Sequence, residues 1–196
     1  MKLIIVRHGE TIENVNGIFQ GQTPGILSKR GINQAKKVGE RLKNEQIDYI
    51  YSSDLNRAKH TAKEIIKYHP KLNLNLIKEL REHDMGILTG QNKNKLNLEW
   101  DDIDLNDPKY KAENYETSMT RANKIIKKLF EKHQNNTVVL VSHGGFMKSL
   151  FAIIMKKSRE KLKHMEHLGN TSINIFELRE DSDHILHLIN CTEHLK

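Results

Sequence analysis

The sequence predicts a three-layer α/β/α fold with a mostly parallel central sheet, helices on both faces and a C-terminal antiparallel hairpin. Residues 3–6 and 138–141 are apolar at successive positions, as in strands that helices cover on both sides. Helix-like and strand-like segments alternate along the chain without a linker. Because 196 residues suffice for one full core, we expect a single domain over residues 1–196.

The first half of the chain predicts strands at 3–7 and 47–51, and a weaker one at 72–77. Ser28 can cap a helix whose inward positions recur at helical spacing: Ile32, Ala35, Val38 and Leu42. Side-chain oxygens of residues 52–54 can cap a second helix, which would bury Leu55, Ala58, Ala62 and Ile65. Arg57 then lies in the first turn of that helix.

The second half begins with an irregular segment, 91–115, which we expect to lie over a functional site. A helix after Thr117 and Ser118 has an apolar stripe of Met119, Ala122, Ile126 and Leu129, and leads into a strand at 138–142. Gly144 and Gly145 open a helix that runs through Met155, and Ser158 can cap another. The segments 172–178 and 184–189 predict the terminal hairpin.

Composition limits the functional classes. The 37% hydrophobic content, the mean hydropathy of −0.65 and the lone Cys191 favour a cytoplasmic protein without a disulfide. The apolar stretch after Met1 and Lys2 is too short for a signal peptide or a membrane span. The net charge of +7 suits nucleic acid or a small anionic substrate, but the lysines are spread over helix-like segments, which favours a solvated face.

Both buried strand candidates end at a histidine that a glycine follows, His8-Gly9 and His143-Gly144. In open α/β sheets the carboxyl ends of the strands meet at the edge where ligands bind. We therefore expect Arg7, His8, Arg57 and His143 to share one crevice.

Two arginines and two histidines form an electropositive pocket that suits a phosphoryl group, whose oxygens match the arginine fork. Histidine can attack phosphorus and carry the group, and arginines can neutralise the oxygens without a metal. The leaving alkoxide then needs a proton from a carboxylic acid. On chemistry alone, Glu82 and Asp84 are nearly equal candidates.

Several motifs occur together in one order: Arg7-His8-Gly9-Glu10-Thr11, Asn14, Gln20-Gly21, Leu27-Ser28, Gly31, Gln34-Ala35, residues 51–55 with Arg57 and Thr61, Leu80-Arg81-Glu82, and residues 141–145. Over nearly the whole chain this set resembles the histidine phosphatase superfamily, the phosphoglycerate mutase-like family. An isolated Arg-His-Gly is a weak signal, but the ordered set is specific.

The resemblance implies that His8 is the phosphorylated nucleophile, that Arg7, Arg57 and His143 surround the phosphoryl group, and that Glu82 is the proton donor. It also implies substrate-binding positions near the phosphate and the mouth of the site: Asn14, Gln20, Gly21 and Gly144. The implied enzyme is a phosphatase for small phosphorylated metabolites that uses no metal and no cofactor.

Two departures and two alternatives accompany this interpretation. Many members have Gly-Glu-Ser where this chain has Ala112-Glu113-Asn114, which weakens the case for a substrate contact by Glu113. Thr89 stands where the family pattern has an acidic residue before a glycine.

The first alternative is a cofactor-dependent phosphoglycerate mutase, for which the chain is short. A basic module that binds phosphate or nucleic acid without catalysis is the second. We expect a monomer or homodimer without nucleic-acid or membrane partners.

Other histidines are expected outside the chemistry. His164 and His167 are spaced to hold a metal, but no further ligand cluster completes a site, which favours a surface pair. His60, His69, His83 and His133 are expected to be solvent-facing or structural.

Overall fold

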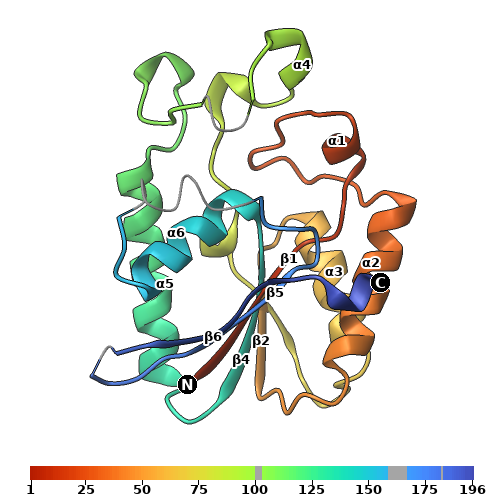
Figure 1. The fold of residues 1–196 in the computed structure, drawn as a ribbon, viewed down its shortest axis with the longest axis vertical. Coiled ribbons are helices and arrows are strands. Elements are labelled where there is room, and N and C mark those ends of the chain that lie inside the picture. The colour runs from red at the N-terminus through yellow and green to blue at the C-terminus, as the bar shows by residue number, and fades with distance from the viewer. Residues whose placement is uncertain (100–102, 159–166, 182) are drawn as a thin grey trace.

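The computed structural model describes residues 1–99, 103–158, 167–181 and 183–196. Within these residues the strands form one six-stranded sheet in the order β3-β2-β4-β1-β5-β6 (Figure 1). Neighbours among β1 to β4 are parallel, whereas β5 is antiparallel to both β1 and β6. This is the predicted mostly parallel sheet with a C-terminal hairpin. The strands are β1 (Lys2–Arg7), β2 (Tyr49–Ser52), β3 (Leu74–Leu76), β4 (Thr137–Ser142), β5 (Ile173–Glu177) and β6 (Ile185–Cys191).

Helices cover both faces of the sheet, α2 and α3 on one side and α5 and α6 on the other (Figure 1). The helices are α1 (Ile12–Val15), α2 (Lys29–Leu42), α3 (Asn56–Ile66), α4 (Lys93–Leu96), α5 (Tyr115–Lys132) and α6 (Gly144–Ile154). Leu3 and Ile5 of β1 pack in the core on the α5/α6 side, and Ile4 and Val6 pack with α2 and α3. A strand buried on both faces has no polar side, which explains its unbroken apolar run.

The ends of the helices follow the predictions in part. Ser28 caps α2 as expected, because its Oγ accepts a hydrogen bond from the Gly31 amide at 2.9 Å. The capping role expected of residues 52–54 is wrong: α3 begins after Leu55 without a side-chain cap, and Asp54 instead pairs with Arg81. Helix α5 begins at Tyr115, before the predicted start, because Asn114 caps it.

Ile32 was expected to face the core from α2, but it is 45% exposed. The buried positions on that turn are Gly31 and Gln34. Loop residues 9–11 pack against this part of the helix, and a Cβ at Gly31 would lie only 1.9 Å from the Glu10 carbonyl oxygen. Backbone contact, not an apolar side chain, therefore fills the space at this end of α2.

The described parts of segment 91–115, residues 91–99 and 103–115, lie beyond the carboxyl ends of the strands, as predicted, with α4 at the top of Figure 1. The segment is less irregular than expected, because its described residues include α4 and a 3-10 turn at Pro108–Tyr110. Ile103, Leu105 and Tyr110 form a small apolar cluster with Phe19 and Leu88.

The helix that Ser158 was expected to cap, together with His164, lies outside the described residues. In the part of the chain that the structure describes, no helix combines the length and apolarity needed to cross a bilayer.

Candidate active site

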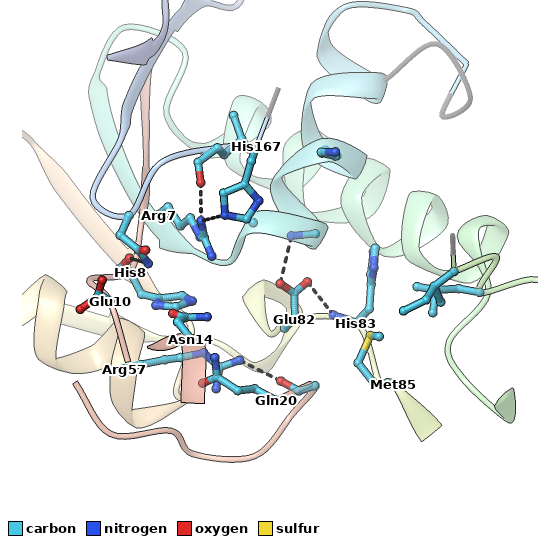
Figure 2. A pocket seen from close by; sticks show the side chains of 18 of the residues that line it. Arg7, His8, Glu10, Asn14, Gln20, Arg57, Glu82, His83, Met85 and His167 are labelled. Atoms are coloured by element: carbon cyan, nitrogen blue, oxygen red, sulfur yellow. Dashed lines mark hydrogen bonds between the residues drawn. The ribbon is translucent and has the colours of Figure 1, made fainter. Parts of the chain in front are cut away.

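Each of the parallel strands leads to one polar residue at the same end of the sheet. His8 follows β1 and His143 follows β4, Arg57 lies in the first turn of α3 after β2, and Glu82 lies in the loop after β3. The predicted convergence of the histidines and arginines is therefore observed. A cavity of about 330 Å³ opens at this edge, with Arg7, His8, Arg57 and Glu82 among its lining residues (Figure 2).

The His8 ring has a defined orientation. Its Nδ1 lies 2.7 Å from the Gly9 carbonyl oxygen, which can only accept a hydrogen bond, so Nδ1 carries a proton. Burial, followed by the charges of Arg57 and Arg7, lowers the pKa of His8 well below its usual value and outweighs the opposing effect of the Gly9 contact. At neutral pH the ring is therefore neutral, with an unshared electron pair on Nε2.

His143 packs against His8, with ring centroids 5.1 Å apart; it is fully buried and is not itself among the residues that line the cavity. Arg57 Nε donates a hydrogen bond to His143 Nδ1 at 3.1 Å. In a neutral ring the proton must then lie on Nε2. This Nε2 is buried and has no hydrogen-bond partner among the described residues, so it is available to donate to an incoming group.

Arg57 is itself held by the loop after Gln20. It is 1% exposed, and its guanidinium donates to the carbonyl oxygens of Gly21 at 2.8 Å and Thr23 at 2.5 Å. The side chain therefore joins three parts of the site: the loop, His143 and the cavity wall. Asp54, three residues earlier in the chain, pairs with Arg81.

Arg7 lies on the opposite side of His8 (Figure 2), where its Nη1 donates to the Leu168 carbonyl oxygen and contacts His167 Nε2 at 2.9 Å. Its Nε is buried without a hydrogen-bond partner among the described residues. Burial lowers the pKa of both Arg7 and Arg57 to about 10, so both remain charged at neutral pH.

Glu82 faces these groups from the loop after β3, with its carboxylate against the first turn of α6 (Figure 2). Its carboxylate accepts hydrogen bonds from the amides of Gly145 at 3.0 Å, Phe146 at 2.8 Å and His83 at 2.9 Å. Burial alone would raise its pKa, but His83, these amides and Arg57 together lower it. Glu82 is therefore ionised at neutral pH.

The two glycines that open α6 give these side chains room. A Cβ at Gly145 would lie 2.7 Å from Glu82 Oε1, and one at Gly144 would lie 3.1 Å from Arg7 Nε. Of the positions that the sequence predicted for substrate binding, all but one line the cavity, namely Arg7, Asn14, Gln20, Gly21, Arg57 and Gly144. His143 is buried and is not among the lining residues. Asp84, the competing acid, is exposed and accepts a hydrogen bond from the Gly86 amide, away from the lining.

Sequence reasoning missed several lining residues. His167 contacts Arg7 where only a surface role was expected, and His83 is buried beside Glu82. Lys148 reaches the cavity one helical turn after Gly144, at a spacing the sequence could have indicated. The apolar part of the lining includes Ile103 and Leu105. Glu113, whose contact with substrate the sequence made doubtful, pairs with Arg121 and is not among the lining residues.

The described donor side chains form no metal-binding cluster. Among the described residues, no three or more His, Cys, Asp or Glu side chains converge closely enough to hold an ion.

Comparison with known proteins places this geometry in a family. The model of the histidine phosphatase superfamily (branch 1) matches residues 3–191. The chain is similar to Phosphoglycerate mutase-like protein 4 of Arabidopsis thaliana, with 30% identity over 100% of this chain and 87% of that protein. It is also similar to the Metal-independent phosphoserine phosphatase of the same plant, with 30% identity over 91% of this chain and 77% of that protein.

A solved structure agrees with the sequence relatives. A mutant phosphoserine phosphatase from Entamoeba histolytica, in complex with phosphoserine, superimposes with a TM-score of 0.85. The alignment covers 100% of this chain and 99% of that one at 29% identity. The two chains therefore share their fold over the aligned length.

Proposed function

Because this chain belongs to the histidine phosphatase superfamily, we propose that it hydrolyses phosphate monoesters of small metabolites through a phosphohistidine formed on His8. The observation that carries the proposal is the state of the His8 ring. It is neutral, its Nδ1 is fixed on the Gly9 carbonyl, and Arg7 and Arg57 flank it. A fixed, neutral imidazole between two cations is suited to attack an anionic phosphorus centre.

In the first step, His8 Nε2 attacks phosphorus, the P–N bond forms and the bond from phosphorus to the ester oxygen breaks. The departing alkoxide takes one proton from Glu82, which must arrive protonated together with the substrate. Arg7 and the Nε2–H of His143 stabilise the phosphoryl oxygens. The products are the free alcohol, phosphorylated His8 and the Glu82 carboxylate.

In the second step, the Glu82 carboxylate accepts a proton from a water molecule whose oxygen attacks the phosphorylated histidine. The P–N bond breaks, its electron pair returns to Nε2, and inorganic phosphate leaves. Glu82 is then protonated and can release the proton or use it for the next substrate.

We propose that no metal takes part, because the charges of Arg7 and Arg57 can supply the neutralisation that Mg²⁺ supplies in other phosphoryl-transfer enzymes. EDTA treatment is expected to leave the rate of phosphate release unchanged. Complete loss of activity, restored by Mg²⁺ or Zn²⁺, would refute metal independence.

Hydrolysis is favoured over mutase chemistry by the wall of the cavity. The lining residues contributed by the described part of segment 91–115 are Ile103, Leu105 and Tyr115, none of which is cationic. A mutase must retain an anionic sugar acid while the phosphoryl group returns to it, and besides Arg7 and Arg57 the described lining offers only Lys148 to pair with its carboxylate.

For the leaving group we propose a small zwitterionic alcohol, with phosphoserine as the first compound to test. Lys148 and Glu10 both line the cavity, so a carboxylate and an ammonium each have a side chain of opposite charge nearby. A sequence relative and a structural neighbour are themselves named phosphoserine phosphatases. Lys148→Met should raise KM for phosphoserine more than for phosphoethanolamine, which lacks the carboxylate.

The deciding experiment is a panel of phosphoserine, phosphoethanolamine, glycerol phosphate and 3-phosphoglycerate, with free phosphate and isomerised product measured together. Release of phosphate from at least one monoester, without isomerisation, is expected. Isomerised phosphoglycerate as the main product would favour the mutase. RNA binding that weakens steeply with salt, without hydrolysis of any ester, would favour the binding module.

A further inference from the structure

We propose that His83, with Ser118 and Ser149, is a positioning group that holds the Glu82 carboxylate at the correct place for proton transfer. This inference rests on the proposed function, because it concerns the acid and base of that reaction. The three side chains come from the loop after β3, from α5 and from α6.

The position of the Glu82 carboxylate depends on two backbone segments. One oxygen accepts from the Gly145 amide, and the other accepts from the Phe146 and His83 amides. The first two amides belong to α6 and the third to the loop. If α6 and the loop moved relative to one another, the carboxylate would have to give up part of this set of hydrogen bonds.

The His83 side chain joins these same two segments. Its Nε2 lies 2.6 Å from Ser118 Oγ and 3.4 Å from Ser149 Oγ, and the two hydroxyls are 2.7 Å apart. Ser149 is on α6, one residue after Lys148, so the contact reaches the helix that carries the amide donors. The Phe146 ring also packs against His83, edge to face at 6.4 Å.

Burial makes this group rigid. His83 is 2% exposed and both serines are fully buried. A buried polar group is stable only while its hydrogen bonds are made, so the three side chains resist separation. Apolar residues could fill the same space between α5 and α6, where Ala122, Met147 and Leu150 already form the core. Unlike apolar side chains, a hydrogen-bonded cluster fixes the relative orientation of the segments it joins as well as keeping them in contact.

The test measures proton transfer rather than activity alone. An alkyl phosphate needs the proton from Glu82 to release its alkoxide, whereas p-nitrophenyl phosphate does not. In single-turnover measurements, His83→Leu is expected to slow phosphorylation of the enzyme by an alkyl phosphate about tenfold or more, and by the aryl ester less than about threefold. His83→Gln, whose amide can replace Nε2, should restore much of the alkyl rate.

A matched control is available at the opposite end of the sheet. His133 is also buried, and its Nε2 is 2.9 Å from the hydroxyl of Tyr51. His133→Leu removes a comparable buried contact and should lower the melting temperature without separating the alkyl and aryl rates. Ser149→Ala, which keeps the His83–Ser118 contact, provides a milder variant should His83→Leu not fold, and should show the same separation to a smaller extent.

Equal slowing of alkyl and aryl phosphorylation in His83→Leu or Ser149→Ala, or unchanged rates for both, would overturn the inference. Its failure is distinguishable from failure of the proposed function. In the latter case the unmodified enzyme itself would release no phosphate and form no phosphohistidine.

Discussion

Arg57 Nε donates to His143 Nδ1 at 3.1 Å, and this one contact determines which nitrogen of the second histidine carries the proton. The same guanidinium holds the carbonyl oxygens of Gly21 and Thr23. Arg57 therefore contributes a charge and also arranges two neighbouring parts of the site. This double role leads to the first prediction.

Arg57→Lys should reduce kcat/KM about tenfold to a thousandfold, the scale of removing one preorganised donor, although the charge is retained. A single ammonium cannot bind His143 and the loop carbonyls in the same fixed geometry. Arg41→Lys is the matched control, because Arg41 forms only an exposed pair with Glu45 and should be nearly neutral. Similar losses in both variants would indicate that general electrostatics, not a built site, holds the substrate.

His8→Ala should abolish the phosphoenzyme. In the unmodified enzyme, rapid quenching without acid followed by mass spectrometry should place phosphate on His8, in a form that is labile to acid and stable to base. The reason is the neutral ring with Nδ1 held by Gly9, which leaves Nε2 as the nucleophile. Phosphate on a serine or on Cys191, or a His8→Ala enzyme that keeps most of its rate, would contradict this mechanism.

Glu82→Gln should slow phosphorylation by an alkyl phosphate on the order of a hundredfold or more, while a burst of nitrophenol persists with the aryl ester. The later hydrolysis of phosphohistidine should slow for both substrates, because the base is lost. Asp84→Asn is the control and should be close to neutral, since Asp84 is exposed and outside the cavity lining. If Glu82→Gln slows both phosphorylation rates equally, Glu82 is not the acid.

The dependence on pH follows from the state of the free enzyme. The pKa of His8 and that of Glu82 both lie below their usual values, so His8 is neutral and Glu82 ionised at neutral pH. The proton for an alkyl leaving group must therefore be taken up with the substrate, whose own second pKa is about 6. Above about pH 6, kcat/KM for the alkyl ester should fall up to tenfold per pH unit as this proton becomes scarce.

The aryl ester is the internal control for that profile, because its leaving group departs without a proton, so its kcat/KM should change little over the same range. On the acid side, both esters should remain active below the usual pKa of histidine, since His8 stays neutral there. Profiles for the two esters that coincide up to about pH 8 would show that no proton is taken up with the substrate.

The sequence was sufficient for the two buried strands and for the cap of α2, although the equally local prediction of a cap for α3 was wrong. An apolar run followed by His-Gly spans only a few residues, and both such runs form buried strands that end at the site. The capping of α2 by Ser28 is equally local. Choosing Glu82 over Asp84 required the family resemblance; of the two, Glu82 lines the cavity, and its role as the acid stays a prediction.

Contacts between residues far apart in the chain could not be predicted from the sequence. The partners of His83 are 35 and 66 residues away in the chain, so no spacing indicates their cluster. His167 meets Arg7 across 160 residues. The expectation for Ile32 failed for a related reason, because helical periodicity cannot show that a loop backbone, at Glu10, already occupies that side of α2.

The place of β1 in the sheet has a consequence for how the protein is made. The strand that carries Arg7 is synthesised before the other described strands, yet its partners are β4 and β5, residues 137–142 and 173–177. Until those residues leave the ribosome, β1 has no neighbour with which to pair. Such long-range pairing is slow, because a large loop must close before the contacts form. The nucleophile can therefore take its place only late in folding, so a nascent chain ending before residue 173 should be unable to form phosphohistidine.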